Sequence, residues 1–297
     1  MSLTLDDLSM SLRGIIAAPP GREIIGADFS AIEARVLAWL AGQQDVLDVF
    51  ASGQDVYVYA AKKINSTDRQ LGKVATLGLG YGMGPIKFAD TARSYGITLP
   101  LKEARRVTLQ WRKANPAITE LWSLLEDACK RSIDNPGVVT PVGAFLKVAA
   151  TKDCLMVQLP SGRAIRYWRP SVKTVTKKIQ TVDEDGEIVE MERESLEVRF
   201  FTPAKDAVSM QMEVTYGGKL VENITQAVAC DLLGHAMDLL EAAGYPVVVH
   251  VHDSIACEAP VGFGSVEEFC SIMSTVPSWA PGLPLAASGY RDTRFRG

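Results

Sequence analysis

The sequence predicts an α+β protein, in which helices and antiparallel strands occupy separate stretches of the chain. Apolar residues recur at helical spacing over most of residues 31–133, whereas short β-branched runs between turn signals take over from about 137 to 216. A third observation is the run Val247–Val251, which enters His252-Asp253 and then resumes with apolar alternation, as in a β-hairpin.

The helical part begins with residues 31–50, where the pattern is broken at Gly42. Residues 55–64, 68–80 and 101–133 are expected to form further helices. The last of these should bend or restart at Asn115-Pro116, because proline lacks the amide hydrogen that a helix interior needs. The apolar positions of the first stretch are Ile32, Val36, Leu37, Leu40, Val46, Leu47 and Phe50.

The β-rich part has two clear turn signals, Pro160-Ser161-Gly162 and the acidic Asp183–Gly186. The second lies between two isoleucine-bearing runs and predicts an exposed β-hairpin. A helix over roughly 219–243 should follow, ended by Gly244 and Pro246, and a last helix is expected near 265–275.

The composition limits the kinds of protein that this chain can be. The 297 residues are 47% hydrophobic and 22% charged, which is ordinary for a globular protein, and the net charge of −4 neither indicates nor excludes nucleic-acid binding. No apolar run reaches the roughly 18 residues that span a bilayer, and the N-terminus lacks a secretion signal. The five scattered cysteines contain no CxxC pair. We therefore expect reduced thiols, a cytoplasmic protein and no membrane partner.

Two carboxylates stand at strand ends. Asp28 closes the apolar run Glu23–Ala27, and Asp253 lies at the tip of the predicted C-terminal hairpin. Two acidic residues on adjacent strands can hold a pair of divalent metals, a common device for phosphoryl transfer on nucleic acids. The alternatives are a helix N-cap for Asp28 and a turn with a capped carboxylate for His252-Asp253.

A second constellation lies on the predicted helix at 68–80. Arg69, Lys73, Leu77 and Tyr81 follow one another in steps of four, so they share one helical face. Two cations, one apolar and one aromatic side chain suit a nucleoside triphosphate. The alternative is a solvated basic edge with Tyr81 in the core. The four glycines between residues 72 and 82 lower helix stability, which indicates that something beyond simple packing retains them.

These strings resemble motifs of the family A DNA polymerases, the bacterial DNA polymerase I superfamily, in phage or prophage style. The string Asp28–Ala38 is similar to motif A. The resemblance implies that Asp28 binds both metals together with Asp253 and Phe29, that Glu33 blocks a ribose 2′-hydroxyl, and that Ser30 lies in the nucleotide site.

The string Arg69–Met83 resembles motif B, the nucleotide-binding helix of the fingers. By that resemblance Arg69 and Lys73 bind the triphosphate, Lys73 also acts in catalysis by offsetting charge on the leaving group, and Tyr81 lies near the template base. Leu77 stands where the family usually has an aromatic residue.

The pair His252-Asp253 resembles motif C, which makes Asp253 the second catalytic carboxylate and brings His252 to the primer terminus. Ser254 stands where the family often has Glu. The string Tyr216–Ala227 resembles the segment that leads into the palm helix. It implies that Asn223 and Gln226 contact DNA in the minor groove, the alternative being two ordinary surface amides.

The cations of residues 101–113 belong to a fingers-like helical segment, and we interpret them as a solvated face rather than a DNA track. They are Lys102, Arg105, Arg106, Arg112 and Lys113.

The resemblance runs from about residue 8 to the end and implies an antiparallel palm sheet (1–44 and 201–297), inserted helical fingers (45–136) and an additional β-rich insertion (137–200). Because motif A begins near the N-terminus, we expect neither a thumb nor an exonuclease domain. The chain would then be a fragment, a truncated gene product or half of a split enzyme, and a separate thumb or exonuclease-bearing chain becomes a candidate partner.

The function that the sequence predicts is template-directed DNA synthesis. The primer 3′-hydroxyl attacks the α-phosphate of an incoming deoxynucleoside triphosphate, with two Mg²⁺ ions, or Mn²⁺, as cofactors and primer-template DNA as partner. One alternative is a catalytically weak nucleic-acid-binding fragment or subunit of a split polymerase. A two-metal nuclease ranks last, because it does not need the face from Arg69 to Tyr81.

Overall fold

The computed structural model describes residues 14–204 and 209–296, and its chain divides into two compact units. The first unit contains the residues up to Arg35 together with those from Val228 onward, and the second contains Val36–Ala227. Two helices cross the boundary, α2 (Ile32–Ala41) and α9 (Gly217–Ala242). The three-part division into palm, fingers and insertion stays a prediction.

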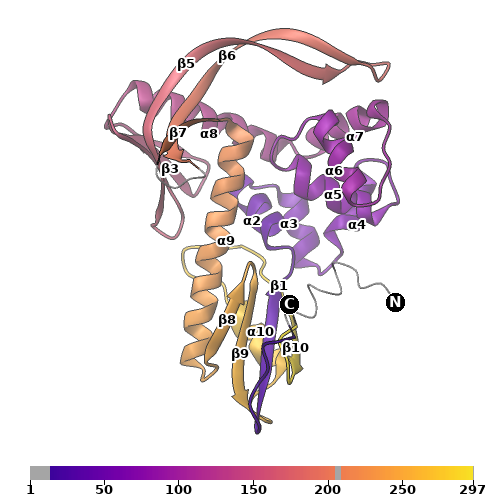
Figure 1. Cartoon of the computed structure of the whole chain (residues 1–297), viewed down its shortest axis with the longest axis vertical. Coiled ribbons are helices and arrows are strands. Elements are labelled where there is room, and N and C mark those ends of the chain that lie inside the picture. Colours follow the sequence, from indigo (N-terminus) through magenta and orange to yellow (C-terminus); the bar gives the residue numbers. More distant parts are fainter. Residues whose placement is uncertain (1–13, 205–208, 297) are drawn as a thin grey trace. The chain divides into compact units, whose positions relative to one another are not determined.

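The first unit is built on a four-stranded sheet in the order β10-β1-β9-β8, with every neighbouring pair antiparallel (Figure 1). The helix α10 (Val266–Met273) packs on this sheet through Phe269 and Met273. The strands are β1 (Arg22–Phe29), β8 (Val247–Val251), β9 (Ser254–Pro260) and β10 (Ala287–Asp292). The predicted C-terminal hairpin is therefore confirmed as β8 and β9, whereas β10 was not predicted.

Strand β1 is central in this sheet and is buried along most of its length. Residues from Ile24 to Ala27 are all buried, and Ile24 packs with Ala256 and Phe295. A continuous apolar strand is expected where both faces of a sheet are covered. The last residues of β1 carry Asp28 to the end of the sheet, so the core of the first unit holds this carboxylate in a fixed place.

The helices of the second unit follow the predicted pattern closely. The break at Gly42 separates α2 from α3, and Asn115 separates α7 from α8. One helix, α6, was not predicted, although Pro85 stands at its first position, where proline is favoured. The helices are α3 (Gln44–Ala51), α4 (Val56–Lys63), α5 (Arg69–Leu79), α6 (Pro85–Ser94), α7 (Leu101–Ala114) and α8 (Pro116–Asp134).

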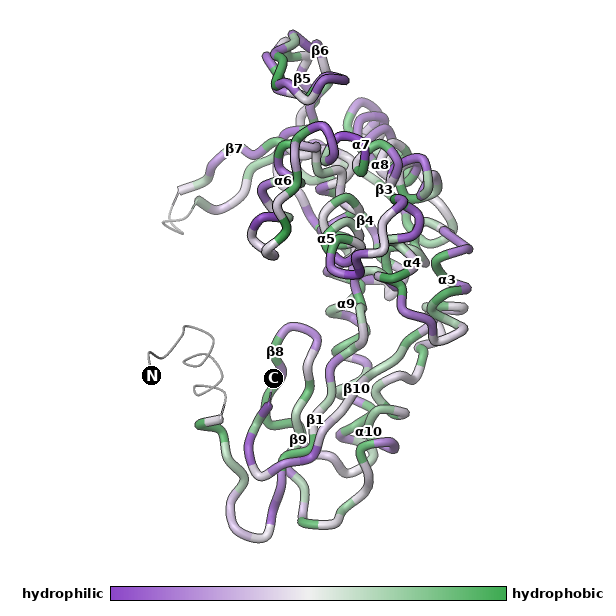
Figure 2. Tube along the Cα trace, turned by 90° about the vertical axis from the view of Figure 1, so that its right-hand side faces the viewer, coloured by the Kyte–Doolittle hydropathy of each residue, from purple (hydrophilic) through white to green (hydrophobic). Residues whose placement is uncertain are grey.

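A six-stranded antiparallel sheet completes the second unit, with its strands in sequence order from β2 to β7. The two long strands β5 and β6 contain both hydrophilic and hydrophobic residues (Figure 2). The predicted hairpin around Asp183–Gly186 is confirmed as their connection. The strands are β2 (Val139–Val142), β3 (Leu146–Ala150), β4 (Cys154–Gln158), β5 (Ala164–Val182), β6 (Ile188–Pro203) and β7 (Met210–Thr215).

The long β5–β6 hairpin reaches back to the helices, and its tip lies at α7 (Figure 1). A Cβ atom added to Gly186 would lie 2.9 Å from Cβ of Lys102, so only glycine allows this close approach. Asp185 also lies 3.9 Å from the Lys102 ammonium. No helix in the described part of the chain is both long and apolar enough to span a membrane.

Candidate active site

The two predicted metal-binding carboxylates lie at one end of the sheet of the first unit, Asp28 near the end of β1 and Asp253 in the turn between β8 and β9. Asp28 pairs with Ser254 in the register of β1 and β9, and the amide of Phe29 donates a hydrogen bond to the carbonyl oxygen of Asp253 at 3.1 Å. His252 and Asp253 form the two-residue connection between β8 and β9. The sheet therefore brings together residues that are more than 220 positions apart in the sequence.

The connection between β8 and β9 has an unusual backbone for its residue types. His252 has a φ of 55°, in the left-handed region that side chains with a Cβ rarely adopt. Two-residue hairpin connections favour positive φ at their first position because this matches the twist of the flanking strands. The tight turn leaves His252 exposed and Asp253 half-buried beside the end of β1.

Ser254 is joined directly to the acidic pair. Its side chain is buried, and its hydroxyl donates a hydrogen bond to Oδ1 of Asp28. A hydroxyl in this place orients one carboxylate oxygen without adding negative charge. The sequence had identified Ser254 only as a departure from the family pattern, and the structure gives it a contact with the predicted metal ligand.

The turn after Asp28 is organised by Arg35, to which sequence analysis gave no role. Arg35 is buried, and its guanidinium donates hydrogen bonds to the carbonyl oxygens of Ser30 at 2.6 Å and Pro284 at 2.7 Å. Ala31 has a φ of 51°, which completes the reversal from β1 into α2. An arginine inside the apolar stripe Ala34–Leu40 was the signal available in the sequence. The turn presents Glu33, half-buried, in the first turn of α2.

Tyr290 on the unpredicted strand β10 lies close to the acidic pair. Its ring covers Gly26, where an added Cβ would meet the hydroxyl oxygen at 2.9 Å. Burial raises the pKa of the Tyr290 hydroxyl, and the negative charge of Asp28 acts in the same direction. This tyrosine therefore stays neutral near the carboxylates and accepts a hydrogen bond from the amide of Arg296 at 2.9 Å.

In the second unit, α5 carries the predicted nucleotide-binding residues. Arg69, Lys73 and Leu77 lie within the helix in steps of four, which confirms the predicted helical spacing. Tyr81 follows just beyond the helix end and is only 9% exposed. Its burial agrees with the alternative interpretation for this one side chain, and its role near a template base stays a prediction.

Arg69 is engaged within the unit. Its Nε donates to Oδ2 of Asp55 at 2.6 Å, and the guanidinium lies 5.2 Å from the centre of the Tyr57 ring. Asp55 is also the N-cap of α4 and accepts from the amides of Tyr57 and Val58. Burial tends to raise the pKa of Asp55, but the bonds from Arg69 and these amides outweigh it, so the pKa is lowered.

Lys73 differs from Arg69 in having its charge uncommitted. It is half-buried on α5, and no residue in the described part of the chain forms a hydrogen bond or ion pair with its ammonium. It is thus a cation held on a helix face and available to an anionic ligand.

The expectation that something beyond packing retains the glycines of this region is wrong for Gly72. A Cβ at this position would lie 2.0 Å from the backbone oxygen of Tyr57, so α4 and α5 cross too closely for any other residue. Gly82 has a φ of 81°, which the turn after α5 requires.

The two predicted DNA-binding amides share the first part of α9, in the second unit. Asn223 donates to the hydroxyl of Tyr167 at 3.2 Å, whereas Gln226 is exposed. Burial raises the pKa of Tyr167 to about 12, so this hydroxyl remains neutral and holds the Asn223 amide in one orientation. Of the two, Gln226 has the more accessible amide.

The donor set of the first unit fits Mg²⁺ better than a metal that needs many protein ligands. Among the described residues no group of three or more histidine, cysteine or acidic side chains is placed to hold a metal. Asp28, near the end of β1, and Asp253, in the turn before β9, offer hard oxygen donors at one end of the sheet. Mg²⁺ is usually bound by one or two carboxylates together with substrate phosphates and water, so a pair of carboxylates is sufficient chemistry for this ion.

Comparison with solved structures shows the kind of fold. The POL domain of Pol1 from M. smegmatis, solved in complex with DNA primer-template and dNTP, matches with a TM-score of 0.59 at 16% sequence identity. The match covers 99% of this chain and 43% of that chain. The chain thus has the fold of a DNA polymerase domain, with mixed helices and antiparallel sheets.

The sequence relatives then specify the family. Residues 5–143 match the model of DNA polymerase family A. The DNA polymerase of Bacillus phage SP02 is 34% identical over 302 residues, which cover 95% of this chain and 42% of the phage protein. DNA polymerase I of Aquifex aeolicus (strain VF5) is 30% identical over 144 residues, or 46% of this chain and 24% of that protein.

These findings identify the chain as a relative of the family A DNA polymerases, with both phage and bacterial relatives, and confirm the resemblance drawn from its motifs. The chain spans less than half the length of these relatives.

Proposed function

We propose that this chain is the palm and fingers core of a DNA polymerase and transfers nucleotides to a primer 3′-hydroxyl under the direction of a template. The main support for the proposal is that Asp28 lies beside the His252-Asp253 turn at one end of an antiparallel sheet. The relatives support the same reaction class, since the proteins that are similar to this chain in sequence are named DNA polymerases.

The first unit is proposed to hold the metals and the primer end. Asp28 and Asp253, with the carbonyl oxygen of Phe29, are the ligands for two Mg²⁺ ions, which Mn²⁺ can replace. When bound, the ions lower the pKa of the primer hydroxyl and stabilise the leaving pyrophosphate. Ser254 orients Asp28 through its hydrogen bond, and the exposed His252 approaches the primer terminus.

The second unit is proposed to hold the triphosphate. Lys73 is the principal phosphate ligand, because its ammonium has no partner in the described part of the chain. It offsets the negative charge that develops on the leaving group and donates a proton to it. Arg69 binds the same phosphates after exchanging its contact with Asp55, and Leu77 contacts the sugar.

The remaining predicted residues select the substrates. Glu33 occupies the space that a ribose 2′-hydroxyl would need, and Ser30 lies in the turn beside it. Tyr81 supports the template base at the end of α5, while Asn223 and Gln226 contact the minor groove of the primer-template duplex without reading its sequence.

Primer extension tests the proposal directly. The chain is incubated at high concentration with a labelled primer-template, Mg²⁺ and the four deoxynucleoside triphosphates, and products are resolved one nucleotide at a time. We expect template-dependent addition that requires the divalent ion. Binding of the DNA without extension would instead favour a nucleic-acid-binding subunit, and shortening of the primer would favour the two-metal nuclease.

A further inference from the structure

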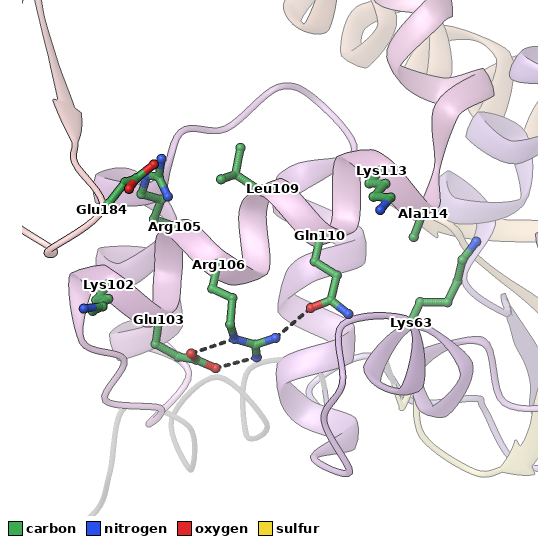
Figure 3. Close-up of a pocket in the computed structure, with 10 residues that line it drawn as sticks. All are labelled: Lys63, Lys102, Glu103, Arg105, Arg106, Leu109, Gln110, Lys113, Ala114 and Glu184. Carbon is green, nitrogen blue, oxygen red and sulfur yellow. Dashed lines mark hydrogen bonds and ion pairs between the residues drawn. The ribbon is translucent and has the colours of Figure 1, made fainter.

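The outer face of α7 carries a basic groove that the proposed active site does not use. A hollow of about 910 Å³ lies along this helix in the second unit (Figure 3). A second hollow of about 390 Å³ shares Arg105, Leu109 and Glu184 with the first. The two hollows are therefore adjacent, and the tip of the β5–β6 hairpin borders both.

Cations outnumber carboxylates among the residues that line this groove. Six of its side chains are basic, namely Lys63, Lys102, Arg105, Arg106, Arg112 and Lys113. Three are acidic, namely Glu103, Asp183 and Glu184. The chain as a whole is acidic, with a net charge of −4, so this concentration of positive charge is local.

Several of the cations are already committed to internal partners. Arg106 donates to both carboxylate oxygens of Glu103 and to Oε1 of Gln110 (Figure 3). Lys63 pairs with Asp45. These contacts hold the floor of the groove in place and do not leave a full positive charge for a ligand.

Two of the cations are uncommitted. Neither Arg105 nor Lys113 has a hydrogen-bond or ion-pair partner in the described part of the chain. Arg112 is only partly satisfied, since one of its Nη atoms donates to the carbonyl of Met83 at 3.2 Å but its buried Nε has no partner. Burial lowers the pKa of Arg112, which is the expected response of a guanidinium that lacks an anion.

The pattern of side chains on this face suits a single strand rather than a duplex. Arg105, Leu109 and Lys113 follow in steps of four, and Leu109 is 48% exposed between the two cations. A duplex presents only its charged backbone to such a surface, because its bases are stacked inside. A single strand offers phosphates to the cations and unstacked bases to Leu109 and to the planes of the arginines.

We propose that this groove binds single-stranded DNA, namely the unpaired template ahead of the primer end. The identity of the strand rests on the proposed polymerase function, whereas the binding chemistry does not. The cations from Lys102 to Lys113 span about 16 Å along α7 at a rise of about 1.5 Å per residue. That length accommodates a short stretch of single strand.

The hairpin tip limits one side of the groove and contributes the unfavourable charge of Glu184. Gly186 and Asp185 hold the tip against Lys102, so Glu184 is kept among the cations by its neighbours. Removing this one carboxylate should therefore strengthen the binding of a polyanion. Sequence analysis interpreted the cations of α7 as a solvated face, and the hollow beneath the hairpin tip is the feature that the sequence did not reveal.

The test is fluorescence anisotropy of the full chain with a labelled 12-nucleotide oligothymidylate and with a blunt duplex of equal length. Arg105→Ala/Lys113→Ala should bind the single strand at least about tenfold more weakly at about 50 mM salt, with a slope of log affinity against log salt shallower by about 1.4. The control is Lys62→Ala/Arg131→Ala, which removes the same charge from exposed positions outside the groove. Its affinity should stay within about twofold of wild type.

Glu184→Gln should bind the single strand about two- to fivefold more tightly than wild type. Misfolding would weaken binding, so it cannot produce this result. Equal losses in the groove and control variants would overturn the proposal, as would weaker duplex binding with single-strand binding retained. Unchanged or weaker binding by Glu184→Gln would do the same.

A primer-extension assay distinguishes failure of this proposal from failure of the proposed function. On a template with one unpaired nucleotide, the groove variant should add the complementary nucleotide at the wild-type rate. On a template with twelve unpaired nucleotides, the groove variant should need a higher DNA concentration than wild type to reach the same extension rate. If the wild-type chain extends no primer at all, the proposed function fails while the anisotropy result still decides whether the groove binds a single strand. Identical DNA requirements on both templates would remove the template strand as its occupant.

Discussion

The two sets of predicted site residues are built in opposite ways. In the first unit the acidic pair is fixed by backbone pairing, because Asp28 stands opposite Ser254 and the Phe29 amide bonds to the Asp253 carbonyl. In the second unit the cations are side chains on a helix surface, and Arg69 is held by Asp55.

The proposed metal ligands of the first unit are therefore preformed, whereas the proposed phosphate ligands of the second unit depend on exchange of contacts. Two carboxylates whose backbone positions are fixed in this way need little rearrangement to accept a cation. Arg69 must give up an ion pair, which is worth little at an exposed position but still competes with a ligand. Lys73 is the exception in the second unit, since it has no contact to give up among the described residues.

The largest effect is expected from the preformed end. Asp28→Ala or Asp253→Ala should reduce nucleotide addition at least about a thousandfold, because each change removes one of two oxygen ligands. Single-turnover primer extension measures this, with circular dichroism to show that the fold is retained. Asp238→Ala, at an exposed position of α9, is the control and should extend at the wild-type rate. Near wild-type extension by either variant would remove that residue from the metal site.

A smaller but still large effect is expected at the phosphate-binding end. Lys73→Ala should lower the rate of the chemical step about a hundredfold, since a preorganised cation is worth a few kcal/mol at the transition state. Arg106→Ala should change the rate little, because its guanidinium is occupied by Glu103 and Gln110. Single-turnover extension with saturating triphosphate compares the two, and an equal or larger defect for Arg106→Ala would mean that the wrong cation was selected.

Sugar selection should respond more modestly. Glu33→Ala should raise ribonucleotide incorporation relative to deoxyribonucleotide about tenfold or more, because a steric block of this size is worth about 1–3 kcal/mol. Competition between the two nucleotides on one template measures the ratio. Glu267→Ala on α10 serves as the matched loss of an exposed carboxylate. An unchanged ratio for Glu33→Ala would assign sugar selection to another residue.

The smallest effect concerns the contact that restrains Arg69. Asp55→Ala removes the N-cap of α4 and should lower stability by about 1 kcal/mol. Asp55→Asn keeps a capping side chain and isolates the charge. Both should bind triphosphate slightly more tightly, because Arg69 is released; weaker binding by Asp55→Asn would show that this carboxylate helps to place Arg69.

The pH dependence of this contact has a definite sign. The pKa of Asp55 is lowered in the folded chain, so its ionised form stabilises the fold fully above the ordinary value of 3.8 and this contribution is lost as pH falls below it. Thermal melting of wild type and Asp55→Asn should therefore differ most above about pH 5 and converge toward about pH 3. A difference that grows as pH falls would contradict the lowered pKa.

Much of the fold was accessible from the sequence because local signals and tertiary structure agree. Helical spacing and the break at Gly42 predict α2 and α3, and the acidic turn at Asp183–Gly186 predicts the hairpin. Strand β10 was missed because its pairing with β1 is tertiary and its sequence has no strong alternation. Helix α6 was missed because it carries a weak apolar pattern, despite Pro85 at its start.

The site shows the same limit at the level of single residues. Motif strings predict Asp28, Asp253 and Lys73 as site residues, since the proposed chemistry requires these residue types. They give no role to Arg35, whose bond to Pro284 depends on a loop 249 residues away. The groove on α7 was likewise invisible, because the long hairpin forms one side of it.

We propose above all that Asp28 and Asp253 together hold a divalent cation at the end of the sheet of the first unit. Fe²⁺ can occupy magnesium sites and, with ascorbate and peroxide, cuts nearby backbone, so mass spectrometry of the fragments locates the ion without any need for activity. We predict cuts at residues 28–30 and 252–254 that excess Mg²⁺ suppresses and that Asp28→Asn and Asp253→Asn abolish. Cuts confined to other segments, or unchanged in both variants, would contradict the claim.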